Sequence, residues 1–496
     1  MSFLKRSSVL ALLLLLTFGA NAQTNTPDKP TWWNKYQYLS GHAANSNAAG
    51  STSVSAGPNV DVSNECGPQS ETYITLNQGK PKNLAGGSNE IFRDPMRAYA
   101  SFDGGASWSG TDAPLPPPLN GANDTRFGSD PSLVFDTRGN LFYSYIVVFF
   151  GGGNGVDGTE LAVAKSTDGG KSFPGATYFS FSSGGDHFND KPMITSDRNP
   201  ASPFRDNIYV AWDAASGGSS AGGIRVANSS DHGASFTVTR ADNPSGPGKS
   251  IAAVPFVGPN GELYVTWNDY SARAITFNRS FDGGNTWGTP VVISNNTLSF
   301  QDAIPAISFR GALLYPACDA DRSGGPHKGR LYCTWMDLAA SGATDILTSF
   351  SDDQGSTWSA RESVTDPLGF VDRFYPWLSV DQTNESVNIS FYDTRNDTTG
   401  SRYMTDVYFT QSTDGGVNWR RPNTRVSSVS SNEHDCNGVF PCSAIDYGNQ
   451  YGDYEGLVSY NGVSHPIWTD SRNNLSPAKG CSTNLTMEEV FTATVQ

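Results

Sequence analysis

Short runs of alternating apolar and polar residues recur along most of the chain, and their apolar members are mostly β-branched or aromatic. Two examples are Ile208–Asp213 and Leu263–Asp269, which lead through a Trp to an acid. A period of two with these residue types predicts β-strands. The same pattern occurs at Leu331–Asp337, Val387–Asp393 and His465–Asp470. Further short strands are expected at Pro131–Phe135, Pro192–Thr195, Pro255–Val257, Ile304–Ser308, Trp377–Val380 and Gly456–Ser459.

A polar octamer of the form Ser-x-Asp-x-Gly-x-(Ser/Thr/Asn)-(Trp/Phe) follows these strands six times, with its serines 51 to 71 residues apart. The copies begin at Ser101, Ser166, Ser229, Ser280, Ser351 and Ser412. Asp accepts hydrogen bonds from nearby backbone N–H groups in tight turns, Gly supplies a positive φ, and the aromatic ring packs beneath the turn. Because six equivalent copies suit architecture better than chemistry, the octamers are predicted to be structural hairpin turns.

The repeating unit contains about four strands, which is the composition of a β-propeller blade. Six units carry the octamer, and a seventh, residues 451–496, stops before its fourth strand. The segment Asn59–Ser63 is expected to supply that strand from the other end of the chain and close the ring, which removes open sheet edges. The sequence therefore predicts an all-β, seven-bladed propeller, with a six-bladed ring as the alternative.

The N-terminus has the three parts of a secretory signal. Lys5 and Arg6 precede the apolar run Val9–Phe18, and Ala20-Asn21-Ala22 follows as a cleavage site. The run is half of the ~20 residues that span a bilayer. We predict a signal peptide at 1–22, a flexible leader at 23–58 and one propeller at 59–496. The protein is expected to be secreted, either extracellular or periplasmic, without a membrane span; an uncleaved anchor is the alternative.

The six cysteines of an exported chain indicate disulfides more than a metal or a catalytic thiol. Sequence permits any pairing of the six. Cys318 and Cys333 bracket a short segment, as do Cys436 and Cys442, so local pairing is expected for both. Cys66 and Cys481 then remain, and their bridge would fasten the closure of the ring.

Composition and charge narrow the function classes. The 52 Gly and 29 Pro, with only 16% charged residues, argue against coiled coils, helical bundles and disorder. With 33 basic against 48 acidic residues, nucleic acid is excluded as a partner, because phosphate binding needs basic surface. Histidine is scarce and no metalloprotease or nucleophile-elbow motif occurs, which argues against a metal-dependent or His-dependent hydrolase. A monomer is expected.

The octamer resembles the Asp-box, or bacterial neuraminidase repeat, and residues 59–496 are similar to secreted sialidase-like propellers. The resemblance implies a glycoside hydrolase, an exo-glycosidase acting on glycans. Sialidases hold the sugar carboxylate with three arginines and use a Tyr–Glu pair with an Asp. The nearest string to the family's arginine motif is Phe92-Arg93-Asp94-Pro95, displaced to just before Ser101, so sialidase specificity does not follow. The alternatives are a non-catalytic propeller that binds glycan or protein and a periplasmic scaffold.

Acids near the starts of the first strands are the candidate site, because these strands line a propeller's channel and begin at one mouth. They are Glu71, Asp130, Asp190, Asp302, Asp372 and Asp453. Converging carboxyl groups can split their pKa values into acid and base roles, or hold Ca²⁺. The alternative is that each acid caps a turn. No resident metal or cofactor is expected beyond this possible Ca²⁺.

Two groups of residues carry the predicted chemistry. The expected catalytic residues are Asp130, Asp190, Asp372, Asp453, Tyr454 and Glu455, of which Tyr454 and Glu455 form the chain's adjacent Tyr–Glu pair. The expected carbohydrate-binding residues are Arg373, Tyr375, Arg395, Tyr451 and Arg472. Since Arg395 and Arg472 each lie two residues after an Asp at the end of a second strand, structural Asp–Arg pairs are the alternative for both.

Overall fold

A computed structural model describes most of the chain beyond its N-terminal region. The described residues are 56–65, 67–91, 93–119, 121, 124–151, 155–184, 189–214, 222–242, 249–307, 310–434, 451–472 and 488–496. The predicted signal peptide, most of the predicted leader, and Cys66, Cys436, Cys442 and Cys481 lie outside them.

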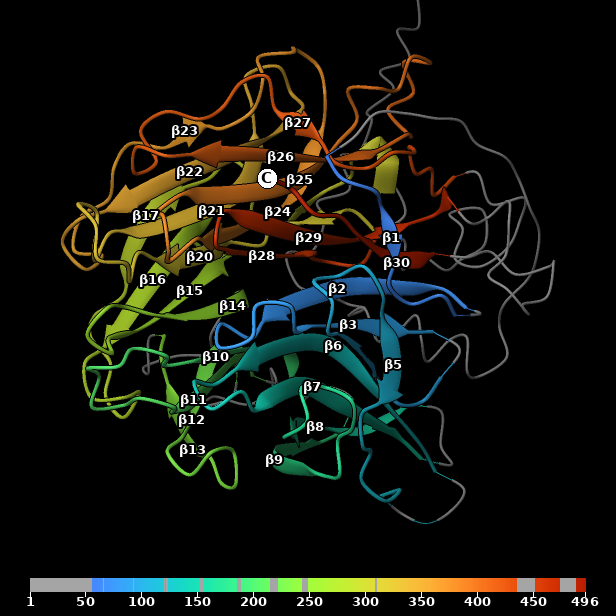
Figure 1. The fold of residues 1–496 in the computed structure, drawn as a ribbon, viewed down its shortest axis with the longest axis vertical. Coiled ribbons are helices and arrows are strands. Elements are labelled where there is room, and N and C mark those ends of the chain that lie inside the picture. The colour runs from blue at the N-terminus through green and yellow to red at the C-terminus, as the bar shows by residue number, and fades with distance from the viewer. Residues whose placement is uncertain are drawn as a thin grey trace, which may run out of the picture.

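Seven antiparallel four-stranded sheets form the molecule, each ordered from an inner to an outer strand (Figure 1). The first blade consists of β2 (Gln69–Leu76), β3 (Leu84–Glu90), β4 (Arg97–Ser101) and β5 (Ser109–Asp112). The second consists of β6 (Thr125–Phe135), β7 (Leu141–Phe150), β8 (Val156–Ser166) and β9 (Ala176–Ser183). The third consists of β10 (Asp190–Ser196), β11 (Ile208–Asp213), β12 (Ile224–Ser229) and β13 (Thr237–Arg240).

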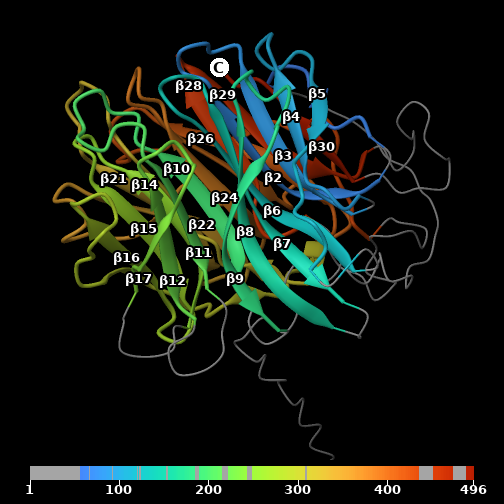
Figure 2. The same cartoon turned by 90° about the horizontal axis from the view of Figure 1, so that it is seen from below.

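The next three blades continue the pattern around the ring. The fourth blade consists of β14 (Ser250–Val257), β15 (Leu263–Asp269), β16 (Ala274–Ser280) and β17 (Val291–Asn295). The fifth consists of β20 (Ala317–Ala320), β21 (Leu331–Leu338), β22 (Thr344–Ser351) and β23 (Glu362–Ser363). The sixth consists of β24 (Arg373–Val380), β25 (Val387–Asp393), β26 (Asp406–Ser412) and β27 (Thr424–Arg425). In Figure 2, the innermost strands β6, β10 and β14 of successive blades lie side by side.

The seventh blade closes the ring with strands from both ends of the chain. It consists of β28 (Gly456–Tyr460), β29 (Val463–Asp470), β30 (Glu489–Thr492) and β1 (Val60–Asp61). Val60 pairs with Thr492 and Asp61 with Phe491, so the blue β1 lies beside the red β30 in Figure 1. Both the seven blades and the closing strand predicted at 59–63 are confirmed.

Tryptophans of the second strands occupy the core between blades. Trp212, Trp267, Trp335 and Trp468 are all at most 1% exposed. Burial of a large apolar side chain stabilises a fold by roughly 1.5–3 kcal/mol. The Trp near the end of each of these strands, which marked them in the sequence, is therefore a core residue that packs between blades.

The octamers form the turns between the third and fourth strands of six blades. In each, the Ser hydroxyl donates to the Asp carboxylate and accepts from the backbone N–H of the Gly at the fifth position, as Ser280 does with Asp282 at 2.7 Å and Gly284 at 2.9 Å. Gly284 has φ +86°, which only Gly adopts readily. Hydrogen bonds from Thr286, Ser280 and Asn285 lower the pKa of Asp282 although burial opposes them. This geometry supports the structural role that was predicted for the octamers.

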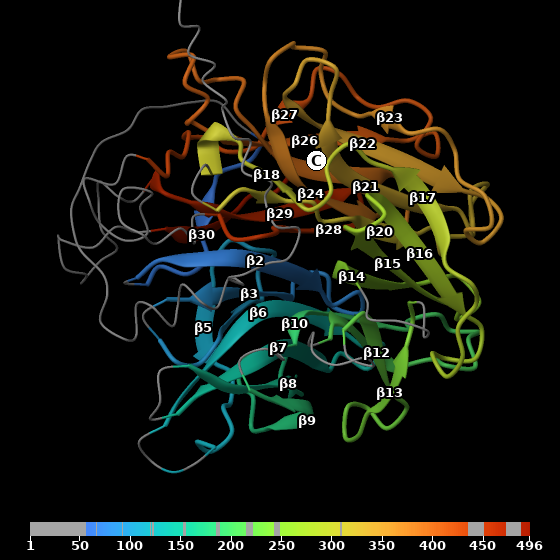
Figure 3. The same cartoon turned by 180° about the vertical axis from the view of Figure 1, so that it is seen from behind.

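The strand predicted at Ile304–Ser308 is wrong. Pro305–Ile307 form a 3-10 turn, η1, and the innermost strand of the fifth blade is β20. Residues between β17 and β20 instead form an insertion that contains the two-stranded sheet β18 (Gln301–Asp302) and β19 (Ala312–Leu313), which lies beside η1 in Figure 3. Alternating apolar residues around Pro305 resemble a strand, but proline offers no N–H for a sheet ladder. Asp302 therefore does not begin an innermost strand.

One disulfide is described, and it joins adjacent strands of the fifth blade. Cys318 of β20 lies opposite Cys333 of β21, which confirms the local pairing predicted for them. The described residues also contain no helix with the length and apolar character to cross a bilayer.

Candidate functional site at one mouth of the channel

Five innermost strands carry the same irregularity near their first residues. Each shifts register there by a bulge, and each bulge holds a non-glycine residue at positive φ. These residues are Glu71 (+53°), Asp130 (+61°), Lys191 (+53°), Ala252 (+64°) and Tyr375 (+47°). Bulges re-aim side chains, and strained backbone of this kind concentrates at functional sites. Four of the five bear groups capable of chemistry.

Charged side chains from four blades and from the insertion before β20 come together in what we call the axial cluster: Glu71, Asp130, Asp190, Lys191, Arg310 and Asp453. Three of them, Glu71, Asp130 and Lys191, stand at bulges. Lys191 Nζ lies 2.8 Å from Asp453 Oδ2 and 3.1 Å from Asp190 Oδ2. Arg310, from the insertion before β20, also pairs with Asp453: its Nε lies 2.9 Å from Oδ1 and its Nη2 lies 2.6 Å from Oδ2. Four of the six acids predicted to converge thus do so.

Neutral hydrogen-bonding side chains connect the acids of the axial cluster. Asn89 Nδ2 donates to Glu71 Oε2 at 2.6 Å, while its Oδ1 accepts from the backbone N–H of Asp130 at 2.8 Å. Ser129 Oγ donates to Asp130 Oδ1 at 2.7 Å. The Lys191 backbone N–H donates to Asp130 Oδ2 at 3.1 Å. Asp130 is therefore surrounded by donors.

The surroundings of these acids raise the pKa values of two of them and lower those of the other two. Burial, reinforced by neighbouring carboxylates, raises the pKa of Glu71 and of Asp190 well above their ordinary values. Burial acts on Asp130 too, but Lys191 and several hydrogen bonds outweigh it and lower its pKa. Arg310 and Lys191 likewise overcome burial and lower the pKa of Asp453. Burial and the neighbouring cations therefore shift the pKa values of acids in one cluster in opposite directions.

The axial cluster is closed to solvent in this structure. Its four acids and Lys191 are at most 3% exposed. Tyr454 and Glu455 lie beside it but do not act as a pair: Tyr454 donates to the carbonyl of Pro131 at 3.0 Å, whereas Glu455 accepts from Tyr392 at 2.7 Å and from Thr72. Both residues lie in the segment just before β28.

The predicted binding residues also have partners within the protein. Tyr375 donates to the carbonyl of Gly452 at 2.5 Å, and the hydroxyls of Tyr451 and Thr405 are hydrogen-bonded at 2.6 Å. Arg373 and Arg395 share Asp393 at 2.9 and 2.6 Å. Arg472 pairs with Asp470 at 2.6 Å. The geometry of Arg395 and Arg472 is that of the structural Asp–Arg pairs held as the alternative for these two residues.

A second group of charges lies at the rim of the same mouth, where Asp302 and Arg402 are partly exposed and Asp372 is buried. We call Asp302, Asp372 and Arg402 the rim cluster. Arg402 Nη1 lies 2.5 Å from Asp372 Oδ2. Asp372 also accepts from the Thr344 backbone N–H at 3.3 Å. Burial raises the pKa of both Asp302 and Asp372, while Arg402 acts in the opposite direction on each, and Asp302 itself raises the pKa of Asp372.

Arg402 is held in place by the loop between β25 and β26. Its φ is +60°, an unusual value for a non-glycine residue. Asp397 fixes the loop by accepting hydrogen bonds from the backbone N–H groups of Thr399 and Tyr403 at 2.8 and 2.7 Å. Burial acts to raise the pKa of Asp397, but hydrogen bonds from Thr399, Met404 and Ser401 outweigh it and lower this pKa to about 2. The arginine is thus presented by a preorganised loop.

Aromatic rings surround the rim cluster. The Arg402 guanidinium lies 4.1 Å from the ring centre of Phe370, which is 56% exposed. Tyr403, 39% exposed, stacks on His434 with ring centres 3.9 Å apart. His434 is itself fixed by a 2.6 Å contact between Nε2 and the Pro305 carbonyl. Exposed rings beside carboxyl groups are suited to a sugar, whose apolar face packs on an aromatic surface.

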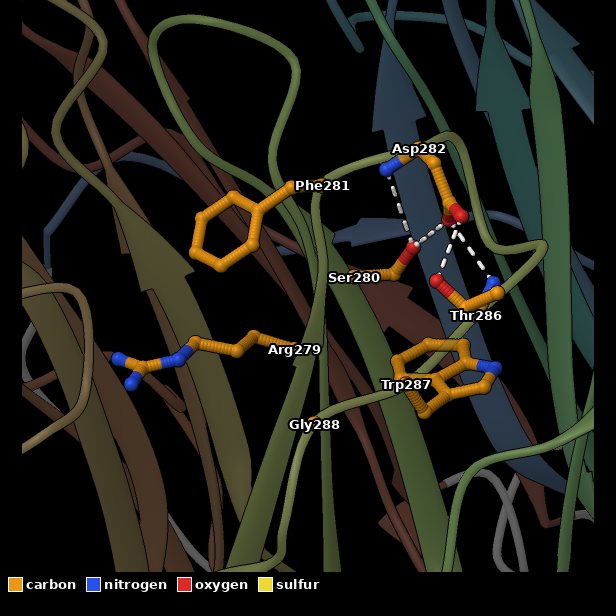
Figure 4. Close-up of a pocket in the computed structure, with 7 residues that line it drawn as sticks. All are labelled: Arg279, Ser280, Phe281, Asp282, Thr286, Trp287 and Gly288. Carbon is orange, nitrogen blue, oxygen red and sulfur yellow. Dashed lines mark hydrogen bonds between the residues drawn. The ribbon is translucent and has the colours of Figure 1, made fainter.

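A pocket of about 430 Å³ lies elsewhere, on the fourth octamer. Figure 4 shows Phe281 and Arg279 on one side of this hairpin, with Asp282, Thr286 and Trp287 on the other. The dashed bonds connect Asp282 to Ser280 and Thr286. Because the Asp282 carboxylate is engaged in hydrogen bonds within its own turn, it is not available as a reactive group in this pocket.

No metal centre is evident in the part of the chain that the structure describes, where no three His, Cys, Asp or Glu side chains are arranged to hold an ion. At the channel mouth, where Ca²⁺ was the alternative, the carboxyl groups of the axial cluster pair with Lys191 and Arg310.

Several residues of the two clusters escaped sequence reasoning. Asn89, Arg310 and Arg402 lie in no repeated motif; Asn89 belongs to β3, whereas Arg310 and Arg402 lie in connections between strands. Asp213 was visible only as the acid that ends β11; burial raises its pKa to about 8. The exposed pair Phe370 and Tyr403 could have been found as aromatics within otherwise polar loops.

Solved propellers share the general architecture at low identity. NanB sialidase of Streptococcus pneumoniae has a TM-score of 0.47 and 11% identity, covering 71% of this chain and 69% of its own. The leech intramolecular trans-sialidase has a TM-score of 0.47 and 13% identity over 78% and 71%. The α-L-arabinofuranosidase of Fusarium graminearum has a TM-score of 0.46 and 11% identity over 77% and 97%. No protein-family model and no curated protein matches the chain. No residue role is taken from these similarities.

Proposed function

We propose that this propeller is an exported exo-acting glycoside hydrolase whose reacting groups are Asp302 and Asp372 of the rim cluster. The observation that carries the proposal is the ion pair of Asp372 with Arg402 beside exposed aromatic rings, with a second carboxyl group, Asp302, near enough to raise the pKa of Asp372. Glycosidases use two carboxyl groups, one to protonate the leaving oxygen and one as base or nucleophile. The resemblance of the octamers to the neuraminidase repeat agrees with this class.

The two carboxyl groups have different surroundings, which assigns their roles in the proposal. Asp372 is in direct contact with Arg402, which favours its carboxylate form as base or nucleophile. Asp302 makes no ion pair with another described residue, and burial raises its pKa, so it serves as the proton donor. Phe370 and Tyr403 would pack against the sugar. Asp130, Asp190, Asp453, Tyr454 and Glu455 would hold the mouth in shape beneath them.

Export is the second element of the proposal. The charged start, apolar run and cleavage site at 1–22 are those of a secretory signal. The Cys318–Cys333 disulfide agrees with an oxidising compartment, since such bonds are rare in a reducing cytosol. A carbohydrate outside the cytoplasm is then the expected substrate.

The proposal is tested with residues 23–496 and a panel of aryl glycosides that includes sialosides and neutral sugars. Release of the aryl group from at least one of them is expected, and it should be lost in Asp302→Asn and Asp372→Asn. Asp352→Asn is the matched control, because Asp352 is exposed in the fifth octamer, on the other face.

Binding without turnover is the second candidate, favoured by the exposed Phe370 and Tyr403. It predicts that no aryl glycoside of the panel is hydrolysed, but that a glycan array is bound and that Tyr403→Ala abolishes binding. Neither hydrolysis nor glycan binding by the folded protein would reject both candidates.

A further inference from the structure

His434 lies beside the rim cluster and contacts two segments that are far apart in the sequence. Its ring stacks on Tyr403, with ring centres 3.9 Å apart and planes inclined by 16°. Its Nε2 lies 2.6 Å from the carbonyl oxygen of Pro305. Tyr403 belongs to the loop between β25 and β26, whereas Pro305 begins η1 in the insertion before β20. One imidazole thus joins two different connections of the propeller at the rim.

The two contacts of His434 use different parts of its ring. A carbonyl oxygen can only accept a hydrogen bond, so Nε2 carries the hydrogen and donates to Pro305. This bond is made at the edge of the imidazole, and the stack on Tyr403 is made on its face. Both contacts therefore coexist, and each can be removed by substitution without the other.

The backbone around His434 is held by hydrogen bonds to the sixth and seventh blades. Ser431 exchanges two backbone hydrogen bonds with Thr405, the residue before β26, at 2.8 and 2.9 Å. The hydroxyl of Ser431 also lies 2.8 Å from that of Ser471, which follows β29. The side-chain oxygen of Asn432 accepts from the His434 N–H at 3.0 Å. The imidazole therefore extends from a fixed backbone.

The segment that accepts the hydrogen bond from His434 carries Asp302. The residues that flank Pro305, Ile304 and Ala306, are at most 2% exposed and anchor η1 in the core. Asp302 lies three residues before Pro305, in β18. Because the two residues share one short segment, the bond from His434 to the Pro305 carbonyl helps to fix where the Asp302 carboxyl lies.

The stack acts on the other side of the rim. The Tyr403 backbone N–H donates to Asp397 at 2.7 Å, which fixes the main chain, but the ring is 39% exposed. His434 is the aromatic partner of this ring. The neighbouring Arg402 pairs with Asp372 at 2.5 Å. The stack therefore sets the orientation of an exposed ring beside the Asp372 carboxylate.

We propose that His434 is a positioning residue of the rim. Its ring orients Tyr403 against the sugar, and its Nε2–H holds the insertion that carries Asp302. The inference rests on the proposed hydrolase for its kinetic consequences, because Tyr403 and Asp302 are the sugar-contacting ring and the proton donor of that proposal. One side chain with two contacts predicts two separable defects: loss of the stack weakens substrate binding, and loss of the hydrogen bond slows the chemical step.

Two substitutions separate the contacts when kcat and KM are measured on an aryl glycoside that the parent hydrolyses. His434→Phe keeps a stacking ring without the N–H, so kcat should fall about tenfold to a hundredfold with KM close to that of the parent. His434→Gln keeps an N–H donor without the ring, so KM should rise about threefold to tenfold with a smaller change in kcat. In a Tyr403→Ala background, His434→Gln should raise KM no further. The same pattern of change in both variants would overturn the inference.

Hydrogen–deuterium exchange of residues 23–496 tests both contacts without a substrate. Backbone amides of residues 301–307 should exchange faster in His434→Phe, and those of residues 397–404 in His434→Gln, each compared with the parent. His327→Phe is the control, because His327 lies against the sixth octamer, 3.6 Å from Glu385, and its replacement should change neither segment.

The two measurements distinguish failure of the inference from failure of the proposed function. Unchanged exchange of both segments in both His434 variants would overturn the positioning role, whether or not the protein hydrolyses glycosides. The expected exchange pattern in a protein that hydrolyses no aryl glycoside would support the positioning role of His434 and reject the hydrolase.

Discussion

Lys191 of the third blade and Asp453 of the seventh are joined across the channel mouth by an ion pair of 2.8 Å, with both side chains at most 3% exposed. A contact between blades that are not neighbours connects opposite parts of the ring. Removing one partner would leave the other charged and buried, which costs about 3–5 kcal/mol.

Asp453→Asn is therefore expected to lower the free energy of unfolding by about 3–5 kcal/mol. Chemical denaturation followed by tryptophan fluorescence measures the change. Asp352→Asn, at an exposed ion pair, should alter it by less than about 1 kcal/mol. Equal stabilities of Asp453→Asn and the parent would show that the pair does not hold the mouth together.

Acidic pH should stabilise this protein. Burial raises the pKa of Glu433 and of Glu455 from 4.5 to about 7, and burial with Glu433 nearby raises the pKa of Glu488 well above its ordinary value. The folded state then binds more protons than the unfolded state between pH 4.5 and about 7. This contribution is complete below pH 4.5 and is lost as pH rises through 7.

One group opposes that trend. Burial lowers the pKa of His465 to about 4, so its contribution is lost as pH falls from 6.5 toward 4. Since several carboxyl groups act against one histidine, Tm measured from pH 4.5 to 8 should fall toward the alkaline end. Glu488→Gln, which mimics the protonated acid, should flatten the alkaline part of the curve. A Tm that rises from pH 5 to 8 would contradict this prediction.

The octamer glycines should be intolerant of a side chain. At Gly284, φ is +86° and an added Cβ would lie 3.1 Å from Leu263 Cδ2. Gly284→Ala is expected to lower the free energy of unfolding by about 1–2 kcal/mol. Gly324→Ala is the matched control, because a Cβ there meets nothing within 4 Å. Similar losses in both variants, measured by denaturant titration, would argue against a special role for the octamer glycine.

Arg402 should set the pH profile of the proposed hydrolase. Its charge lowers the pKa of Asp372 and of Asp302 against the effect of burial, so Arg402→Ala should raise both. The acidic limb of kcat/KM, which reports ionisation of Asp372, should move to higher pH, and Arg402→Lys should restore part of the shift. An acidic limb that stays in place in Arg402→Ala would mean that Asp372 is not the group that titrates.

The repeating parts of the fold were predictable, whereas the site was predictable only in part. Alternating strands and the Ser-Asp-Gly octamer recur, so seven blades and the closing strand at 59–63 follow from pattern alone. The fifth blade was misplaced because Pro305 and its apolar neighbours mimic a strand inside an insertion. Arg310 and Arg402 belong to connections that occur once, so no repeat in the sequence indicates where they lie, and Asn89 of β3 lies in no repeated motif.

The division of the six predicted acids could also not be foreseen. Glu71 and Asp130 stand at bulges and converge with Asp190 and Asp453, whereas Asp372 pairs with Arg402 on the rim and Asp302 lies near enough to raise the pKa of Asp372. Asp302 lies in the insertion before β20, where a strand was expected.

The most direct test of the central claim is the kcat/KM of Asp372→Asn on whichever aryl glycoside the parent protein hydrolyses. The account predicts a loss of at least about a hundredfold, in the range of general acid–base catalysis, with Tm essentially retained. Activity within threefold of the parent in a correctly folded Asp372→Asn variant would contradict the assignment of catalysis to the rim cluster.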